Sequence, residues 1–274
     1  MAPSLTVPVD KPYTVVKVED LLDNQLVSVD SQRKFINEIK GAIQYFFSKE
    51  DNTFRDHYPE RVDTTNFPFK GFILHGKPGT GKTEAVRMAF RGLRSVLEKE
   101  GLDLRLFHIN PADINRKGVG DIEQRMRGVF EAAKENEKRQ RTIVLFDDIE
   151  TLIIERTDSN STEWSRAANG VFFHEVDRLP TSRVLVIATT NEPGMVDKAI
   201  RSRLSMRKME PPSHEEMLTV AEAALPRSSP NLPSRKALME AVEKRIKDSD
   251  EPPSFRLARK SVIEVLMSEV VGWR

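Results

Sequence analysis

The residues from Gly76 to Thr83 have the types and the spacing of a phosphate-binding loop. They read G-x-x-x-x-G-K-T, in which the glycines let backbone N–H groups curl around phosphate oxygens. Lys82 can reach the β- and γ-phosphates, and the hydroxyl of Thr83 can bind Mg²⁺. A helix-favouring stretch begins at Lys82, so the positive end of its dipole faces the same anion. The residues assigned to nucleotide binding are Gly76, Lys77, Pro78, Gly79, Thr80, Gly81, Lys82, Thr83 and Glu84.

Two adjacent carboxylates follow an apolar stretch at 142–146. Asp147, at the end of that stretch, is placed to hold Mg²⁺ through its water shell beside Thr83. Asp148 is then placed to orient or deprotonate an attacking water. Adjacent acids after a strand also commonly cap the segment that follows, but the nearby phosphate loop favours the magnesium site. We therefore expect Lys82 and Asp148 to take part in catalysis, and Thr83 and Asp147 to bind the metal.

The elements that must position these residues are apolar stretches that alternate with stretches of helical periodicity. Such alternation predicts an α/β fold of the P-loop NTPase kind, in which a parallel sheet has helices on both faces. Ligands of these sheets bind beyond the carboxyl ends of the strands, where the phosphate loop lies. The predicted strands are 71–75, 104–109, 142–147 and 184–189, and the predicted helices between them are 82–99, 122–138 and 164–176.

The two ends of the chain differ from this alternating part. Residues 1–17 are punctuated by proline, which predicts an extended arm, and only helical periodicity follows residue 210. The remaining predicted segments are a helix at 31–48, a surface loop at 52–69 and helices at 213–225, 234–247 and 254–270. The predicted domains are the arm at 1–17, a large α/β nucleotide-binding domain at 18–210 and a small all-α lid domain at 211–274.

Composition limits the kinds of protein that this chain can be. With 43 basic and 42 acidic residues, the net charge is +1, so the whole chain is not an electrostatic binder of nucleic acid or anionic membranes. Cysteine is absent, which excludes disulfides, thiolate zinc sites and a cysteine nucleophile. Neither a secretory signal nor an apolar stretch of ~20 residues is present, so we expect a soluble cytoplasmic protein. The five histidines lack metal-ligand spacing, so no transition metal is expected.

Several motifs resemble, in their order along the chain, those of the AAA family of ATPases within the AAA+ superfamily. The resemblance covers residues 18–274 and implies a single AAA module without a large N-terminal domain. It further implies ATP and Mg²⁺ as cofactors and a homo-oligomeric ring, a hexamer in this family, that acts on a protein substrate. The segments that carry it are Pro68–Gly76 before the phosphate loop, Asp147–Leu152 at the acidic strand end, Ala188–Asn191 as a polar sensor and Asp197–Leu204 as an arginine-finger segment.

The resemblance also implies roles for single residues. The amide of Asn191 would help to position the attacking water. Arg201 and Arg203 would reach the nucleotide of a neighbouring subunit and neutralise charge in the transition state, with Arg201 preferred, although either can equally be a solvated surface charge. Arg256 resembles an arginine that touches the γ-phosphate of its own subunit, and its alternative is an exposed residue at a helix start. Backbone around 26–28 would lie against the base, with ATP expected over GTP.

The sequence departs from the family pattern at two positions. Gly118 stands where peptide-threading members carry an aromatic residue in the loop that lines the pore, and glycine has no side chain to grip a polypeptide. Asp148 stands where the family has glutamate, which is one methylene longer, so we expect slow hydrolysis. In addition, the helix at 165–179 resembles the corresponding helix of ATPases that remodel HORMA-domain proteins.

Three functions fit these features. The first is a ring-forming AAA ATPase that couples ATP binding and hydrolysis to the remodelling of a protein partner, and the nucleotide-site residues together favour it. The second is a scaffold whose assembly is switched by nucleotide, with slow turnover, as the departures at Gly118 and Asp148 would allow. The third is a nucleic-acid-linked loader or motor with a basic pore around Arg116 and Lys117, against which the neutral total charge argues.

Overall fold

A six-stranded sheet organises the part of the chain that the structure, a computed structural model, describes: residues 11–17, 21, 27–47, 69–114, 121–134, 139–152, 163–226 and 232–271. The strand order is β1-β3-β4-β5-β2-β6, and every pairing is parallel except that of β1 with β3. The α/β fold with a parallel sheet is therefore confirmed. The strands are β1 Thr14–Val16, β2 Gly71–His75, β3 Asp103–Ile109, β4 Gln140–Phe146, β5 Val184–Thr190 and β6 Leu204–Lys208.

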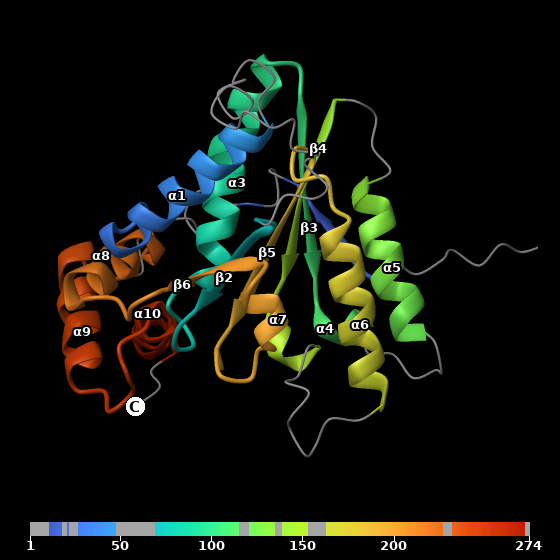
Figure 1. The fold of residues 1–274 in the computed structure, drawn as a ribbon. Helices are drawn as coiled ribbons and strands as arrows, with labels where there is room; N and C mark the ends of the chain where they lie inside the picture. The colour runs from blue at the N-terminus through green and yellow to red at the C-terminus, as the bar shows by residue number, and fades with distance from the viewer. Residues whose placement is uncertain are drawn as a thin grey trace, which may run out of the picture.

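Helices cover both faces of the sheet, as Figure 1 shows. One face carries α1 (Asp30–Phe47) and α3 (Lys82–Lys99), and the opposite face carries α5 (Asp121–Lys134) and α6 (Glu163–Asp177). Three further helices pack around an apolar core of their own: α8 (His214–Ala224), α9 (Arg235–Lys247) and α10 (Phe255–Val271). Short helical turns lie between the longer elements: α4 (Pro111–Ile114), η2 (Ile149–Thr151) and α7 (Lys198–Arg201).

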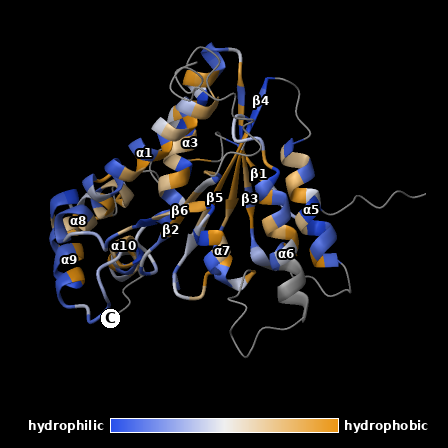
Figure 2. Ribbon diagram, viewed as in Figure 1, coloured by the Kyte–Doolittle hydropathy of each residue, from blue (hydrophilic) through white to orange (hydrophobic). Residues whose placement is uncertain are grey.

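The central strands are apolar because both of their faces are covered. Along β3, Leu104 and Leu106 pack with α1 and α3, whereas Phe107 and Ile109 pack with α5 and α6. Successive side chains of a strand point to opposite faces, so a strand that is buried on both sides is a continuous apolar run. Every residue of β5 is buried in this way, and Figure 2 shows the centre of the sheet in orange. None of the helices described is long and apolar enough to cross a membrane.

Two edge strands differ from the sequence-based expectation. Residues 14–16 fall in the predicted arm but form β1, and the ring of Tyr13 beside them stacks on Phe107 with 4.3 Å between centroids. β6 pairs with β2 although Arg207 and Lys208 make it too polar for a strand signal. Residues 52–68 of the predicted loop and 135–138 of a predicted helix lie outside the described residues.

Serine side chains determine where the last three helices begin. Ser213 accepts a hydrogen bond from the backbone N–H of Glu216, and the carboxylate of Glu216 accepts one from the backbone N–H of Ser213. The hydroxyl oxygens of Ser234 and Ser254 accept from the backbone N–H three residues on, at 3.3 and 3.0 Å. These caps satisfy donors that the first turn of a helix leaves free, so the predicted helix starts agree with the structure to within about one residue.

The packing of α6 on the sheet gives a prediction about stability. Phe172 is fully buried, and its ring centroid lies 5.8 Å from that of Phe130 and 5.3 Å from that of Phe146. We expect Phe172→Ala to lower the free energy of unfolding by about 3–5 kcal/mol, because it removes buried area and leaves a cavity. Denaturant titration followed by circular dichroism measures this. Val96→Ala, at an exposed site, should change it by less than about 0.5 kcal/mol, and equal losses for the two variants would contradict the packing.

Candidate functional site

The phosphate loop joins β2 to α3 at the carboxyl edge of the sheet, and its glycines have no room for a side chain. Gly79 and Gly81 have φ values of 78° and 82°, in the left-handed region. A Cβ on Gly79 would lie 2.8 Å from the Cβ of Ser254, and a Cβ on Gly81 would lie 2.0 Å from Nε2 of Gln32. The loop is therefore packed tightly against the start of α10 and against α1.

Lys82 is held at the mouth of this loop. Its side chain is nearly buried, and Nζ donates to the carbonyl oxygens of Gly76 and Lys77 at 2.9 and 3.2 Å and to Oδ1 of Asn191 at 2.7 Å. Burial lowers the pKa of Lys82, while three nearby carboxylates oppose that shift. The ammonium group lies where it can bind an anionic oxygen placed in the loop.

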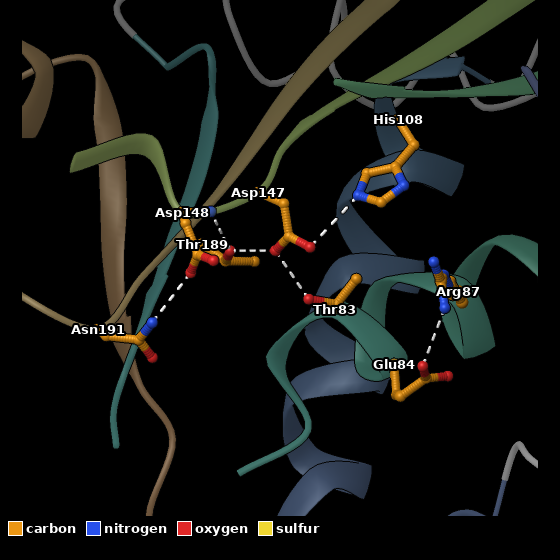
Figure 3. Close-up of polar contacts among 8 residues, drawn as sticks. All are labelled: Thr83, Glu84, Arg87, His108, Asp147, Asp148, Thr189 and Asn191. Carbon is orange, nitrogen blue, oxygen red and sulfur yellow. Dashed lines mark hydrogen bonds and ion pairs between the residues drawn. The ribbon is translucent and has the colours of Figure 1, made fainter. Parts of the chain in front are cut away.

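Asp147 is the centre of a hydrogen-bond cluster (Figure 3). Its Oδ1 accepts from the hydroxyls of Thr83 at 2.8 Å and Thr189 at 2.5 Å, and its Oδ2 lies 3.3 Å from Nε2 of His108. Burial alone would raise the pKa of Asp147, but the hydrogen bonds from His108, Thr189 and Thr83 outweigh it and lower the pKa to about 2. The carboxylate therefore stays ionised at neutral pH, as a metal-binding acid must.

Two of the residues around Asp147 are absent from the site that the sequence predicts. His108 lies on β3, and the parallel register pairs it with Leu145 of β4, two residues before Asp147. Thr189 lies on β5, and its hydroxyl also accepts from the backbone N–H of Asp148 at 3.0 Å. The predicted strands place these residues at one edge of the sheet, but the spacing of residues in the sequence does not indicate which side chains meet.

Asp148 and Asn191 form a second group beside the first (Figure 3). Asp148 has a left-handed backbone, with φ of 47°, and its Oδ1 accepts from Nδ2 of Asn191 at 2.9 Å. Burial and the negative charges of Asp147 and Glu150 raise the pKa of Asp148. Glu150 accepts from the backbone N–H of Asn191 at 2.9 Å, which fixes the backbone of the predicted sensor residue. Asn191 thus bridges Lys82 and Asp148, one through each end of its amide.

The structure separates the two arginines of the predicted finger segment. Arg203 donates from Nε and Nη2 to the carboxylate of Asp177 at 2.5 and 2.7 Å, and its guanidinium lies 5.3 Å from the ring centroid of Phe173. Arg201 makes no such pair with the residues described. Its Nε is buried and has no hydrogen-bond partner among them. Neither arginine lines the cavity at the phosphate loop of its own chain.

A cavity of about 500 Å³ lies beside the loop and gathers most of the predicted binding residues. Arg256 lines it, as does Glu84, which also pairs with Arg87 at 3.0 Å (Figure 3). Of the predicted backbone segment at 26–28, Val27 lines the cavity and Leu26 lies outside the described residues. The cavity-lining residues of the loop and of the two groups above are Pro78, Gly79, Gly81, Lys82, Thr83, Asp147, Asp148, Thr189 and Asn191.

These residues fit a magnesium nucleotide. Thr83 and Asp147 present a hydroxyl and a carboxylate 2.8 Å apart, which are oxygen donors of the kind that Mg²⁺ prefers. Within the described ranges no group of three or more histidine or acidic side chains could hold a metal ion, so Mg²⁺ here would complete its shell with phosphate oxygens and water. The loop amides, unshielded by side chains at Gly79 and Gly81, leave room for the phosphates.

Comparison with known families agrees with this geometry. The model of AAA, the ATPase family associated with various cellular activities, matches residues 72–211. The chain belongs to the AAA family. The matched segment contains the phosphate loop, both acidic residues, Asn191 and the two arginines, so the AAA membership that these motifs predict is confirmed. Gly118, which the resemblance places in the pore loop, lies outside the described residues.

The AAA relatives are longer proteins than this chain. Vacuolar protein sorting-associated protein 4 of Dictyostelium discoideum is 28% identical over 194 residues, which are 70% of this chain and 40% of the relative. ATPase-like fidgetin of Schizosaccharomyces pombe is 29% identical over 194 residues, 66% of this chain and 26% of the relative. Spastin of Drosophila virilis is 32% identical over 153 residues, 54% of this chain and 18% of the relative. The chain therefore spans less than half the length of these relatives.

A solved structure shares the AAA fold over nearly the whole chain. A chain in the E. coli MS115-1 HORMA:CdnC:Trip13 complex superposes with a TM-score of 0.66, covering 93% of both chains at 19% identity. At this identity the likeness shows the fold alone.

The pair of Arg203 with Asp177 gives a prediction about pH. The hydrogen bonds from Arg203 lower the pKa of Asp177, so the pair stabilises the fold above the ordinary pKa of aspartate and this contribution is lost as the pH falls through the lowered value. We expect Arg203→Ala to lower the free energy of unfolding at neutral pH by about 1 kcal/mol or less, because both side chains are partly exposed. Denaturant titrations at neutral pH and below about pH 4 should show the difference from the parent shrinking. Arg201→Ala is the matched control, and the same pH-dependent loss there would contradict the assignment.

Proposed function

We propose that this AAA module binds ATP with Mg²⁺ in the cavity and hydrolyses it. The observation that supports this most directly is the line of hydrogen bonds from Lys82 through Asn191 to Asp148, which joins a phosphate-binding cation, a polar sensor and a candidate base. Thr83 and Asp147 lie beside that line as the oxygen donors for Mg²⁺. Relatives whose names describe them as ATPases support the same activity.

Each residue has one task in this mechanism. Lys82 and the loop amides bind the β- and γ-phosphates and neutralise their charge. Asp148 accepts the proton of the attacking water, and its raised pKa makes it a stronger base than an ordinary aspartate. Asn191 orients the water and the phosphate. Mg²⁺, held through Thr83 and Asp147, would neutralise further charge on the phosphate oxygens.

We also propose that turnover is slow. The carboxylate of Asp148 is one methylene shorter than the glutamate of most AAA members, so it reaches less far from the end of β4. Oδ1 of the same carboxylate accepts a hydrogen bond from Asn191 at 2.9 Å, which limits how far the carboxylate can turn toward the water. Small displacements of this kind lower the rate of proton transfer by large factors.

We propose that the working form is a ring, hexameric as in other AAA proteins, with Arg201 reaching the nucleotide of the neighbouring subunit. Arg203 is bound to Asp177 of its own chain, whereas Nε of Arg201 has no partner in the part of the chain described. An arginine supplied by a neighbour neutralises charge that develops on the γ-phosphoryl group. The site is then complete only where two subunits meet.

Remodelling of a protein partner is the work that we propose for this ring. The name of one relative, ATPase histone chaperone abo1 of Schizosaccharomyces pombe, describes such an activity for that protein. A HORMA-domain protein is the first partner to test, because the helix at 165–179 resembles those of ATPases that remodel such proteins and a solved complex of this fold contains one. The alternatives are a nucleotide-switched scaffold, which the short Asp148 favours, and a nucleic-acid loader, to which a net charge of +1 lends no support.

The proposed base gives a direct test. Asp148→Asn should lower steady-state hydrolysis by a factor of about 100 or more, because the variant keeps the size of the side chain but cannot accept the proton. Phosphate release measures the rate, and equilibrium binding of a fluorescent ATP analogue should remain close to that of the parent. Lys82→Ala should lose binding. An Asp148→Asn variant as fast as the parent would remove this role, and a parent that binds ATP without turnover would favour the scaffold.

The shared site gives a second test. The specific activity of the parent should rise with protein concentration as rings form, and native mass measurements on the same samples report the assembly. Arg201→Ala should still assemble but lose turnover by a factor of roughly 100 or more. Arg203→Ala is the matched variant, and we expect a smaller loss that follows its lower stability. If Arg203→Ala were inactive in intact rings and Arg201→Ala active, the two assignments would be reversed.

A further inference from the structure

The cavity beside the phosphate loop has two chemically different ends. The end at the loop is polar and charged, as phosphate requires. The other end is lined by apolar side chains from the segment before α1, from α8 and from α10, namely Val27, Val220 and Phe255, which form a small apolar cluster with Val29. A flat ring system joined to the phosphates fits such an end, where few polar groups can determine which ring is accepted.

Gln32 of α1 lines the cavity where the apolar side chains meet the loop. It is 3% exposed, and its Nε2 donates to the carbonyl oxygens of Thr80 and Gly81, both at 3.4 Å. A Cβ on Gly81 would lie 2.0 Å from this Nε2 and 3.2 Å from Cδ2 of Phe255. The amide of Gln32 and the ring of Phe255 therefore both lie against the loop at Gly81.

The two loop carbonyls determine which end of that amide is free. A carbonyl oxygen attracts the NH₂ group of a glutamine and repels its Oε1, so the amide can face the loop only through Nε2. Gln32 lines the cavity, and the described part of the chain provides no donor to its Oε1. The side chain thus presents one hydrogen-bond acceptor to a ligand in the cavity.

We propose that Gln32 reads the base and selects adenine over guanine. Adenine carries an amine at C6, which can donate to Oε1, whereas guanine carries an oxygen at the same carbon and would leave two acceptors facing each other. If the amide turned to offer Nε2 to guanine, Oε1 would face the carbonyls of Thr80 and Gly81 and both hydrogen bonds would be lost. This selection rests on the proposed function, because it requires a nucleoside triphosphate in the cavity.

Ligand-binding measurements on the unmodified protein test the inference without any substitution. Calorimetric titration in the presence of Mg²⁺ would compare ATP, GTP, purine riboside triphosphate, which has no group at C6, and inorganic tripolyphosphate. We expect ATP to bind about tenfold more tightly than purine riboside triphosphate and on the order of a hundredfold more tightly than GTP. Equal affinities for ATP and GTP would overturn the inference and leave the proposed function standing. Binding of none of the triphosphates would overturn both.

Gln32→Met separates base reading from support of the loop. Methionine keeps the length of the side chain and removes both polar atoms, so the preference for ATP over GTP should collapse to about twofold or less. The affinity for tripolyphosphate should stay within about twofold of the parent. An equal loss for all four ligands would mean that Gln32 only braces the loop, which overturns the inference. Arg33→Met, on the exposed side of the same helix turn, is the matched control and should keep the preference of the parent.

Discussion

The hydrogen bond from the backbone N–H of Phe255 to the carbonyl oxygen of Gly79, at 2.9 Å, joins the last helix to the phosphate loop. The same helical bundle also reaches α1, because Glu216 accepts from the backbone N–H of Ser31 at 2.7 Å. Since Gln32 of α1 contacts the loop in turn, elements from distant parts of the sequence enclose it. A loop with left-handed glycines has little stiffness of its own, so the backbone hydrogen bond from Phe255 helps to hold its shape.

Within that cavity, two adjacent carboxylates acquire opposite properties from their surroundings. Burial acts on both, but Asp147 receives hydrogen bonds from His108 and two threonines and its pKa falls to about 2. Asp148 is turned away from that cluster by its left-handed backbone, and burial together with the charges of Asp147 and Glu150 raises its pKa. Titratable neighbours whose pKa values are pushed apart can divide the work, one remaining ionised for a cation while the other exchanges a proton.

Local signals explain which features could be predicted from the sequence. The buried strands are apolar runs and the last three helices begin at serines that cap them, so both are predicted to within about two residues. β1 and β6 are edge strands, short or polar, whose positions depend on partners far along the chain. His108 meets Asp147 only through the parallel pairing of β3 with β4, and Gln32 meets the loop only when α1 docks beside α3. The spacing of residues along the chain predicts neither the contact of His108 with Asp147 nor that of Gln32 with the loop.

The contacts of Lys82 connect phosphate binding to the proposed base. An ammonium group has three donors, and the carbonyls of Gly76 and Lys77 and Oδ1 of Asn191 use all of them. An anionic phosphate oxygen is a stronger acceptor than a neutral carbonyl, so its binding displaces one of these contacts. The loop carbonyls are fixed by the backbone, whereas the amide of Asn191 can turn. Because Nδ2 of that amide holds Asp148, phosphate binding at Lys82 would be coupled through Asn191 to the proposed base.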